Sequence, residues 1–120
     1  SLTQAALIYD IHHQYLLAGA DMVETNTFGA SSVAQADYGL SEFAYVMNFA
    51  SARLARAACD AFTAADSLRP RYVAGALGPQ PRTASISPDV NDPGARNIDF
   101  EALRQTYAEQ LRGLLDGVCM

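Results

Sequence analysis

Two short apolar runs, each followed by a polar loop and then by a helical pattern, constrain the fold of this chain most. The first run, residues 20–23, leads into Glu24-Thr25-Asn26-Thr27-Phe28, and the second, residues 71–74, leads into Gly75-Ala76-Leu77-Gly78-Pro79. This succession of strand, loop and helix, met twice, is typical of parallel α/β proteins. Ligands of such proteins bind beyond the carboxyl ends of the strands, so the two loops are the first candidates for a binding site.

Capping residues and apolar spacing predict the order α–β–α–β–α. The elements are a helix over Thr3–Ala18, a strand over Asp21–Thr25, a long helix that begins at Ser41, a strand over Arg71–Leu77 and a helix that begins after Asp99. Thr3 and Asp99 are suitable N-cap residues, and Gly19 and Gly117 are suitable where the first and last helices end. A short helical turn is expected from Ser31 to Ala36, ending at Gly39. Residues 78–98, with four of the five prolines, are expected to form a long loop.

Each longer helix has apolar residues at steps of three and four. These stripes are Leu7, Ile8, Ile11, Tyr15 and Leu16; then Phe43, Val46, Met47, Ala50, Leu54, Ala58, Ala61 and Phe62; then Phe100, Leu103, Tyr107, Leu111 and Leu114. A two-stranded sheet is too small to cover them, since parallel sheets are larger and buried on both faces. We therefore expect an α/β fold that is a partial (β/α)8 TIM barrel, about strands 2 and 3 with their flanking helices, cut from a larger protein.

Charge and cysteine content narrow the class of protein. The net charge is −5 and the eight basic residues are scattered, so nucleic-acid binding is disfavoured. No apolar run approaches the roughly 20 residues of a membrane helix, and no signal peptide opens the chain. Cys59 and Cys119 lack metal-type spacing, so we expect free thiols, no membrane partner and a cytoplasmic protein. His12 and His13 are adjacent, which is a poor metal pair on a helix, and both are expected at the surface.

Several segments carry a family resemblance that covers nearly the whole chain in register. They are Leu16–Phe28, Ala34–Leu40, Tyr72–Pro79, Arg82–Pro93 and Arg96–Phe100. These segments resemble the homocysteine-binding barrel of the cobalamin-dependent methionine synthases. The Thr-Asn-Thr-Phe element alone resembles the wider homocysteine methyltransferase family, whereas the Ser-Pro-Asp-Val-Asn-Asp-Pro loop at 87–93 resembles the synthases specifically. By this resemblance, residues 1–120 are a fragment of the homocysteine-binding domain.

The resemblance implies a methyltransferase of methionine biosynthesis. Homocysteine, activated on zinc, would take a methyl group from methylcobalamin to give methionine, and 5-methyltetrahydrofolate would recharge the cobalamin. The implied zinc ligands are three cysteines of later strands, which Cys59 and Cys119 do not match, so we expect no metal ligand, no catalytic residue and no activity in the isolated chain. Its implied partners are homocysteine, the rest of the barrel, and the folate and cobalamin domains.

Two alternatives to this reaction stay open. One is a homocysteine methyltransferase that uses betaine or S-methylmethionine as its methyl donor. The other is a non-catalytic polypeptide that acts by association with other barrel fragments. The chain also ends in Gly117-Val118-Cys119-Met120, without the Gly-Gly pair and the aspartate with which the family continues, so a truncated or aberrant end is expected.

The resemblance implies that Thr25, Asn26, Thr27 and Phe28 line the homocysteine site, with Gly78 and Pro79 shaping the end of the next strand. Hydroxyl, amide and backbone N–H groups suit an α-carboxylate, and an aromatic ring suits the aliphatic part of the substrate. The residues themselves leave another interpretation open. In it, the threonine hydroxyls satisfy backbone groups at the strand end, the ring is part of the core and the glycine is a simple turn.

Two further groups of residues keep an open role. Side chains alternate along a strand, so Glu24 and Asn26 share one face while Thr25 and Thr27 share the other. Glu24 therefore joins either a polar network inside the barrel or an arginine beside the helices. In the long loop, Arg82, Ser85, Asp89 and Asn91 either contact a docked cobalamin module or fold the loop on itself, and the second is typical of such turn-forming residues.

Overall fold

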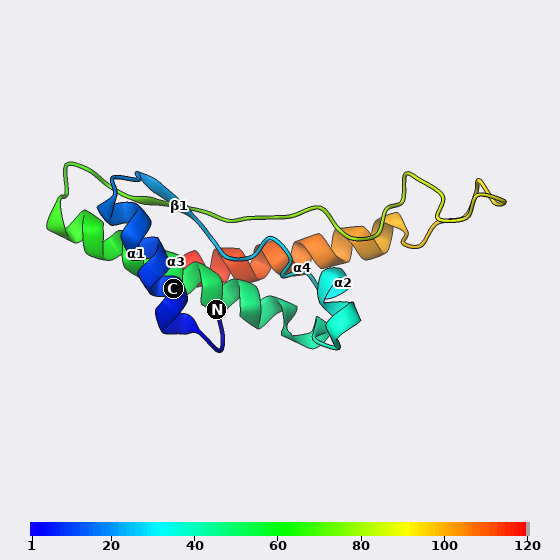
Figure 1. Ribbon diagram of the computed structural model, residues 1–120, viewed down its shortest axis with the longest axis horizontal. Coiled ribbons are helices and arrows are strands. Elements are labelled where there is room, and N and C mark those ends of the chain that lie inside the picture. Colours follow the sequence, from blue (N-terminus) through cyan, green and yellow to red (C-terminus); the bar gives the residue numbers. More distant parts are fainter. Residues whose placement is uncertain (120) are drawn as a thin grey trace.

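The computed structural model describes residues 1–119 and shows an elongated molecule of 59 × 24 × 22 Å (Figure 1). Its order is α1 (Ala5–Leu17), β1 (Met22–Glu24), α2 (Ser32–Gln35), α3 (Ala44–Ala65), β2 (Tyr72–Ala74) and α4 (Phe100–Cys119). Two 3₁₀ turns, Ala36–Tyr38 and Ser41–Phe43, lie between α2 and α3. Met120, the last residue of the expected aberrant end, lies outside the described residues.

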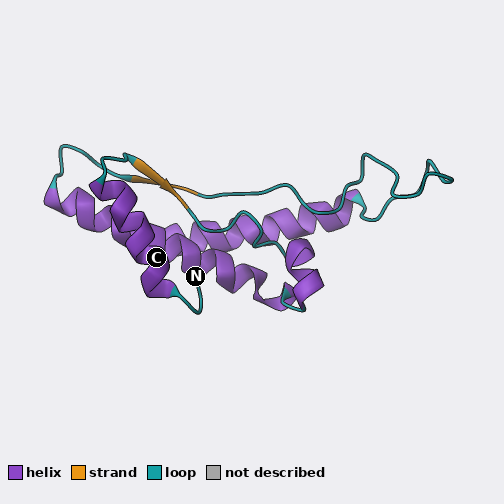
Figure 2. Cartoon of the chain, in the orientation of Figure 1, coloured by secondary structure: helices purple, strands orange, loops and turns teal. Residues whose placement is uncertain are grey.

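The two strands pair in parallel, as the sequence predicts, with Val23 opposite Val73. Hydrogen bonds continue the pairing past both ends, from Tyr72 N to Asp21 O at 3.0 Å and from Thr25 N to Ala74 O at 2.9 Å. Figure 2 shows the helices gathered on one side of this small sheet. Val23 is buried beneath them, whereas Met22 on the opposite face is 57% exposed. The described residues therefore form an α/β layer with one bare sheet face.

The core lies where α1 and α3 meet the helix-facing side of the sheet. Leu16, Val23, Ala55, Ala58 and Cys59 form its buried cluster, and Tyr9, Phe62 and Val73 pack around it. At the amino ends of the strands, Arg69 links the segment before β2 to the segment before β1. Its Nε lies 2.7 Å from Asp21 Oδ1, and its Nη2 donates to the Gly19 carbonyl.

Small residues allow α3 and α4 to lie close together. Gly113 of α4 lies against Tyr45 and Asn48, and one turn later Gly117 lies against Phe49, so the two helices run in the same direction (Figure 1). A Cβ on Gly113 would stand 2.6 Å from the Tyr45 carbonyl oxygen, and one on Gly117 would stand 2.5 Å from that of Phe49. Both distances are shorter than van der Waals contact, so neither position admits a side chain in this packing.

The buried sides of the helices differ from the predicted apolar stripes. Of those positions, only Leu16, Ala58 and Leu114 are buried, while Phe43 and Phe100 are exposed. The buried residues are instead mainly small or polar, namely Ala44, Asn48, Ser51, Ala52, Ala55, Ala58 and Cys59 in α3, and Thr106, Gln110, Gly113, Leu114 and Gly117 in α4. Large side chains do not fit between helices this close, so they lie on the outer sides.

The predicted helix ends are partly confirmed. Ser31 and Asp99 cap α2 and α4, because their side-chain oxygens accept hydrogen bonds from Ala34 N and Ala102 N. Gly19 and Gly39 have positive φ values of 108° and 67° and end their helical segments as expected. Three predictions were wrong. Gln4, not Thr3, precedes α1; a 3₁₀ turn separates Ser41 from α3; and Gly117 lies inside α4, where packing against α3 needs it.

Among residues 1–119, no helix combines the length and apolar character that a membrane crossing requires.

Candidate functional site at the carboxyl ends of the strands

The loops after β1 and β2 meet through two threonine hydroxyls. Thr25 Oγ1 and Thr27 Oγ1 lie 2.6 Å apart, and both side chains are buried. Thr25 Oγ1 accepts a hydrogen bond from Ala76 N at 3.0 Å, and Thr27 Oγ1 donates to Ala76 O at 2.8 Å. Thr27 Oγ1 donates in that bond, so Thr25 Oγ1 is the donor between the two hydroxyls. The pair therefore joins the two strand ends on the side of the helices.

Two buried amide side chains hold the same loops from α3 and α4. Gln110 Nε2 donates to Thr27 O at 2.7 Å and to Ala76 O at 3.4 Å. Asn48 Nδ2 donates to Ala30 O and to Ala44 O, each at 2.7 Å. Both side chains are fully buried, so removing either would take a hydrogen-bond donor away from buried carbonyl oxygens where water cannot readily replace it. The helices thus fix the backbone from Thr27 to Ala30.

A close backbone contact adds to these bonds. The carbonyl of Phe28 lies where a Cβ of Gly78 would stand, and the phenyl ring lies 3.1 Å from that same point. Gly78 O also accepts a hydrogen bond from the Tyr107 hydroxyl at 3.2 Å. The glycine is therefore required by the approach of the two loops, in addition to the turn that the sequence indicates.

On the other side of these loops, the side chains are open. Glu24, Asn26 and Phe28 are all exposed, and Phe28 is 65% exposed. Asn26 and Phe28 line one hollow of about 280 Å³ that also borders Met47 and Ser51 of α3. Phe28 and Pro79 line a second hollow of about 540 Å³. The alternation predicted for Glu24 to Thr27 is confirmed.

Of the six sequence-predicted site residues, the structure brings Asn26, Phe28 and Pro79 to the open side. Thr25 and Thr27 lie on the helix side with their hydroxyls already bonded, and Gly78 is buried against Phe28. The ion pairs of the described residues do not include Glu24, whose carboxylate faces the open side. The candidate site wall is thus one face of the strand end, and the residues of the other face hold that strand end in place.

The long loop before α4 makes contacts within itself. Arg96 donates to the carbonyls of Ala84, Pro93 and Ala95, and Asp89 Oδ1 accepts from Asn91 N at 2.9 Å. Figure 1 shows this segment, in yellow, reaching beyond the first turn of α4. These contacts fold the loop on itself and leave Ile86 and Val90 exposed.

The described residues do not fit a metal centre. The Cys59 thiol is buried, donates to Tyr72 O at 3.3 Å, and has a pKa raised by that burial, which is the opposite of an activated thiolate. Cys119 is exposed at the end of α4. Across residues 1–119, no three His, Cys, Asp or Glu side chains gather closely enough to hold a metal ion.

His12 corrects one prediction from the sequence. It was expected at the surface and is only 5% exposed, between α1 and β1, where burial lowers the pKa of its imidazole. Sequence reasoning also missed Gln110 and Asn48. Their signal is weak but present, since each is spaced three or four residues from other small or polar residues that α3 and α4 bury.

Comparison with known proteins identifies a matching family and two similar solved structures. A family model described as homocysteine S-methyltransferase matches residues 1–119. The homocysteine methyltransferase MmuM from Escherichia coli, in its oxidized form, is 26% identical with a TM-score of 0.73, and the match covers 97% of this chain and 40% of that one. Its metallated form is 28% identical with a TM-score of 0.72, covering 95% and 40%. The chain therefore spans about 40% of the length of these structures.

Proposed function

We propose that this chain, which belongs to the homocysteine S-methyltransferase family, is the part of a homocysteine-binding (β/α)8 barrel that supplies one wall of the homocysteine pocket. The family match over residues 1–119 carries this proposal. The open side at the carboxyl ends of two parallel strands supports it, because that end of a barrel is where substrates bind. The other strands, and the groups that perform the chemistry, come from outside the chain.

The six site residues divide by role in this proposal. Asn26 and Phe28 contact homocysteine directly, the amide through its polar groups and the ring through the aliphatic part of the substrate. Pro79 shares a hollow with Phe28 and closes the same wall. Thr25, Thr27 and Gly78 are positioning residues, because their hydroxyls and close backbone contact fix the loop that presents Asn26 and Phe28.

For the methyl donor, we propose methylcobalamin recharged by 5-methyltetrahydrofolate, on the support of the residue 87–93 loop. A donor such as betaine or S-methylmethionine fits at least as well, since the family match and the E. coli structures concern homocysteine methylation in general. Zinc lowers the pKa of a bound thiol and so makes a nucleophile at neutral pH. Zinc with either donor, and cobalamin and folate with the first donor only, would be bound outside residues 1–119.

A chimera tests the homocysteine wall. This chain replaces the aligned segment of the E. coli homocysteine methyltransferase, and folding is verified by circular dichroism and thermal unfolding. Isothermal titration then measures homocysteine binding with the Asn26→Ala and Phe28→Ala variants. We expect each variant to weaken binding by about tenfold, the effect of one lost hydrogen bond or buried contact. The exposed Tyr38→Phe is the matched control, because it alters only a hydroxyl at the rim.

Two outcomes would contradict the proposal. A folded chimera that does not bind homocysteine would contradict the assignment of this segment to the pocket wall. Unchanged binding in both variants would contradict the two proposed contacts of Asn26 and Phe28. The isolated chain gives a further control: zinc-dependent homocysteine binding to it would require a metal site that its described residues do not form. The donor is decided separately, because only a cobalamin-dependent enzyme continues in its gene into folate and cobalamin domains.

A further inference from the structure

One side chain of the loop after β2 is held through its backbone and through its own polar group. Gln80 stands between Pro79 and Pro81, and the second proline restricts the backbone of Gln80 to extended conformations. Ser31 Oγ donates a hydrogen bond to Gln80 Oε1 at 2.5 Å. Ser31 is only 1% exposed, so this anchor is itself buried. Such restraint on a polar side chain in a loop is typical of a preorganised binding group.

The bond to Ser31 decides which end of the Gln80 amide is available to a ligand. Ser31 Oγ already accepts a hydrogen bond from Ala34 N at 3.0 Å, so its proton is directed to the amide oxygen. The amide nitrogen therefore points away from Ser31, and among residues 1–119 it has no hydrogen-bond partner. Gln80 lines the hollow of about 540 Å³ that also borders Phe28 and Pro79. The structure thus offers this hollow an oriented hydrogen-bond donor.

The other polar groups of this hollow suit the charged end of an amino acid. Asp37 is the charged residue of its lining and is exposed at the rim. Gln35 Nε2 donates to Gly29 O at 2.8 Å, which leaves the Gln35 amide oxygen as an acceptor. An ammonium group finds acceptors in these two side chains, and a carboxylate finds a donor in Gln80. The Phe28 ring adds an apolar surface for a short aliphatic chain.

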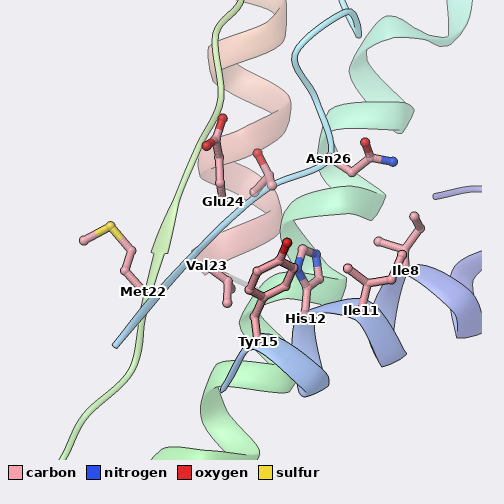
Figure 3. Close-up of a pocket in the computed structure, with 9 residues that line it drawn as sticks. Ile8, Ile11, His12, Tyr15, Met22, Val23, Glu24 and Asn26 are labelled. Carbon is pink, nitrogen blue, oxygen red and sulfur yellow. The ribbon is translucent and has the colours of Figure 1, made fainter. Parts of the chain in front are cut away.

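A hollow of about 460 Å³ between α1 and β1 is less suited to this role. His12 and Tyr15 of α1 and Glu24 of β1 are among the residues that line it, and Figure 3 shows that it lies beside the strand. Ligands of parallel α/β proteins bind beyond the carboxyl ends of the strands. The hollow that Gln80 lines is at that end, because the loops after both strands form it.

We infer that Gln80 is a further substrate-binding residue, whose Nε2 donates a hydrogen bond to the α-carboxylate of homocysteine, and that Ser31 is the positioning residue that orients it. The inference rests on the proposed function and deepens it, because it makes the site selective for thiols that carry a carboxylate. Asn26 lines one of the two hollows that meet at Phe28, and Gln80 lines the other. A substrate whose aliphatic part lies on this ring therefore has its charged end beside Gln80.

Two thiols test this contact in the chimera with the E. coli enzyme. One is homocysteine, and the other is 3-aminopropane-1-thiol, which has the same chain and amine but no carboxylate. Gln80→Glu keeps an oxygen for Ser31 and replaces the amide donor by a carboxylate oxygen. By isothermal titration, we expect this variant to bind homocysteine about tenfold more weakly or worse, and the aminothiol no more weakly than before. The exposed Gln14→Glu adds the same charge on α1 and should change neither affinity.

A double-mutant cycle separates the positioning role of Ser31 from its capping of α2. Ser31→Ala removes the cap whatever residue stands at position 80, so it should lower the thermal stability of the chimera in either background. Its effect on homocysteine affinity should be large with Gln80 and nearly absent with Gln80→Glu, because the donor that Ser31 orients is then gone. A serine with only a structural role would weaken binding equally in both backgrounds.

Several outcomes would overturn the inference. Unchanged homocysteine binding in Gln80→Glu would show that the amide does not contact the substrate. An equal loss of affinity for both thiols would show that the effect does not depend on the carboxylate. In either case the chimera still binds homocysteine, so the proposed function stands. A folded chimera that binds neither thiol would instead contradict the proposed function, and the inference with it.

Discussion

The carbonyl of Phe28 occupies the space that a side chain at Gly78 would need, so the loops after β1 and β2 touch through their main chains. This contact lies at the end of the threonine network and beneath the exposed Phe28 ring. Because the two loops form the proposed pocket wall, the contact fixes the distance between its halves.

Gly78→Ala should therefore lower both stability and homocysteine binding. The new methyl group would overlap the carbonyl of Phe28, and the Gln110 bond to Thr27 O holds the adjoining backbone, so the loops must separate, at a cost of about 1–3 kcal/mol in the free energy of unfolding. Chemical denaturation of the chain measures this loss, and titration of the chimera measures binding. Gly29→Ala is the matched control, since a Cβ there meets no atom within 4 Å. Equal effects of the two substitutions would contradict the close contact.

Gly113→Ala and Gly117→Ala should each destabilise the chain although alanine favours helices. The gain in helix propensity is about 1 kcal/mol. Against it stands overlap with the Tyr45 and Phe49 carbonyl oxygens, which belong to helix backbone and cannot move aside. We expect a net loss of about 1–3 kcal/mol for either change, measured by thermal or urea unfolding. Gly94→Ala in the long loop, where the nearest atom is a side-chain oxygen at 3.4 Å, should change stability little.

These glycines also show where sequence reasoning succeeded and where it did not. Strand order and parallel pairing follow from the apolar runs, and the cap at Asp99 and the helical turn that begins near Ser31 follow from local chemistry, so all were predicted. Gly117 was assigned to a helix end because glycine is common there. Its actual role depends on Phe49, 68 positions earlier, which no local pattern reveals.

The same distinction applies to the candidate site. The segment Thr25–Phe28 was correctly identified as the carboxyl end of a strand, and its alternation was predicted from the strand period. Which face meets the helices could not be predicted, because Thr25 and Thr27 suit a substrate as well as a backbone partner. The amides of Asn48 and Gln110 were missed because polar residues on a helix usually face solvent.

Gln110→Ala should loosen the loop that carries Asn26 and Phe28. The substitution removes the bonds from Gln110 to Thr27 O and Ala76 O, which keep only those from Ala30 N and the Thr27 hydroxyl, at a cost of about 1–3 kcal/mol plus that of the cavity. Amide exchange of residues 27–30 should quicken in step with the loss of stability measured by denaturation. Gln105→Ala is the control, because this side chain is exposed and bonds only to Glu101. Unchanged exchange in Gln110→Ala would show that the threonines alone hold the loop.

Acid should destabilise this chain through His12. Burial lowers the pKa of His12 below 6.5, so around and below that pH the unfolded chain binds a proton that the folded chain binds less readily. The free energy of unfolding is therefore highest above pH 6.5 and falls as the pH is lowered through 6.5 toward the folded-state pKa. The other titratable groups of the hollow between α1 and β1 are Tyr15, on the same helix, and Glu24, on β1, and neither is bonded to Nε2. Denaturation at pH 7.5 and pH 5.5 should show a smaller difference in the free energy of unfolding for His12→Phe than for the unchanged chain. The control is His13→Phe, next to it on α1 and packed on Phe62, which should keep the full difference.

Equal pH dependence in all three proteins would assign the acid sensitivity to other groups, and would mean that His12 accepts its proton as readily in the folded chain as in the unfolded chain.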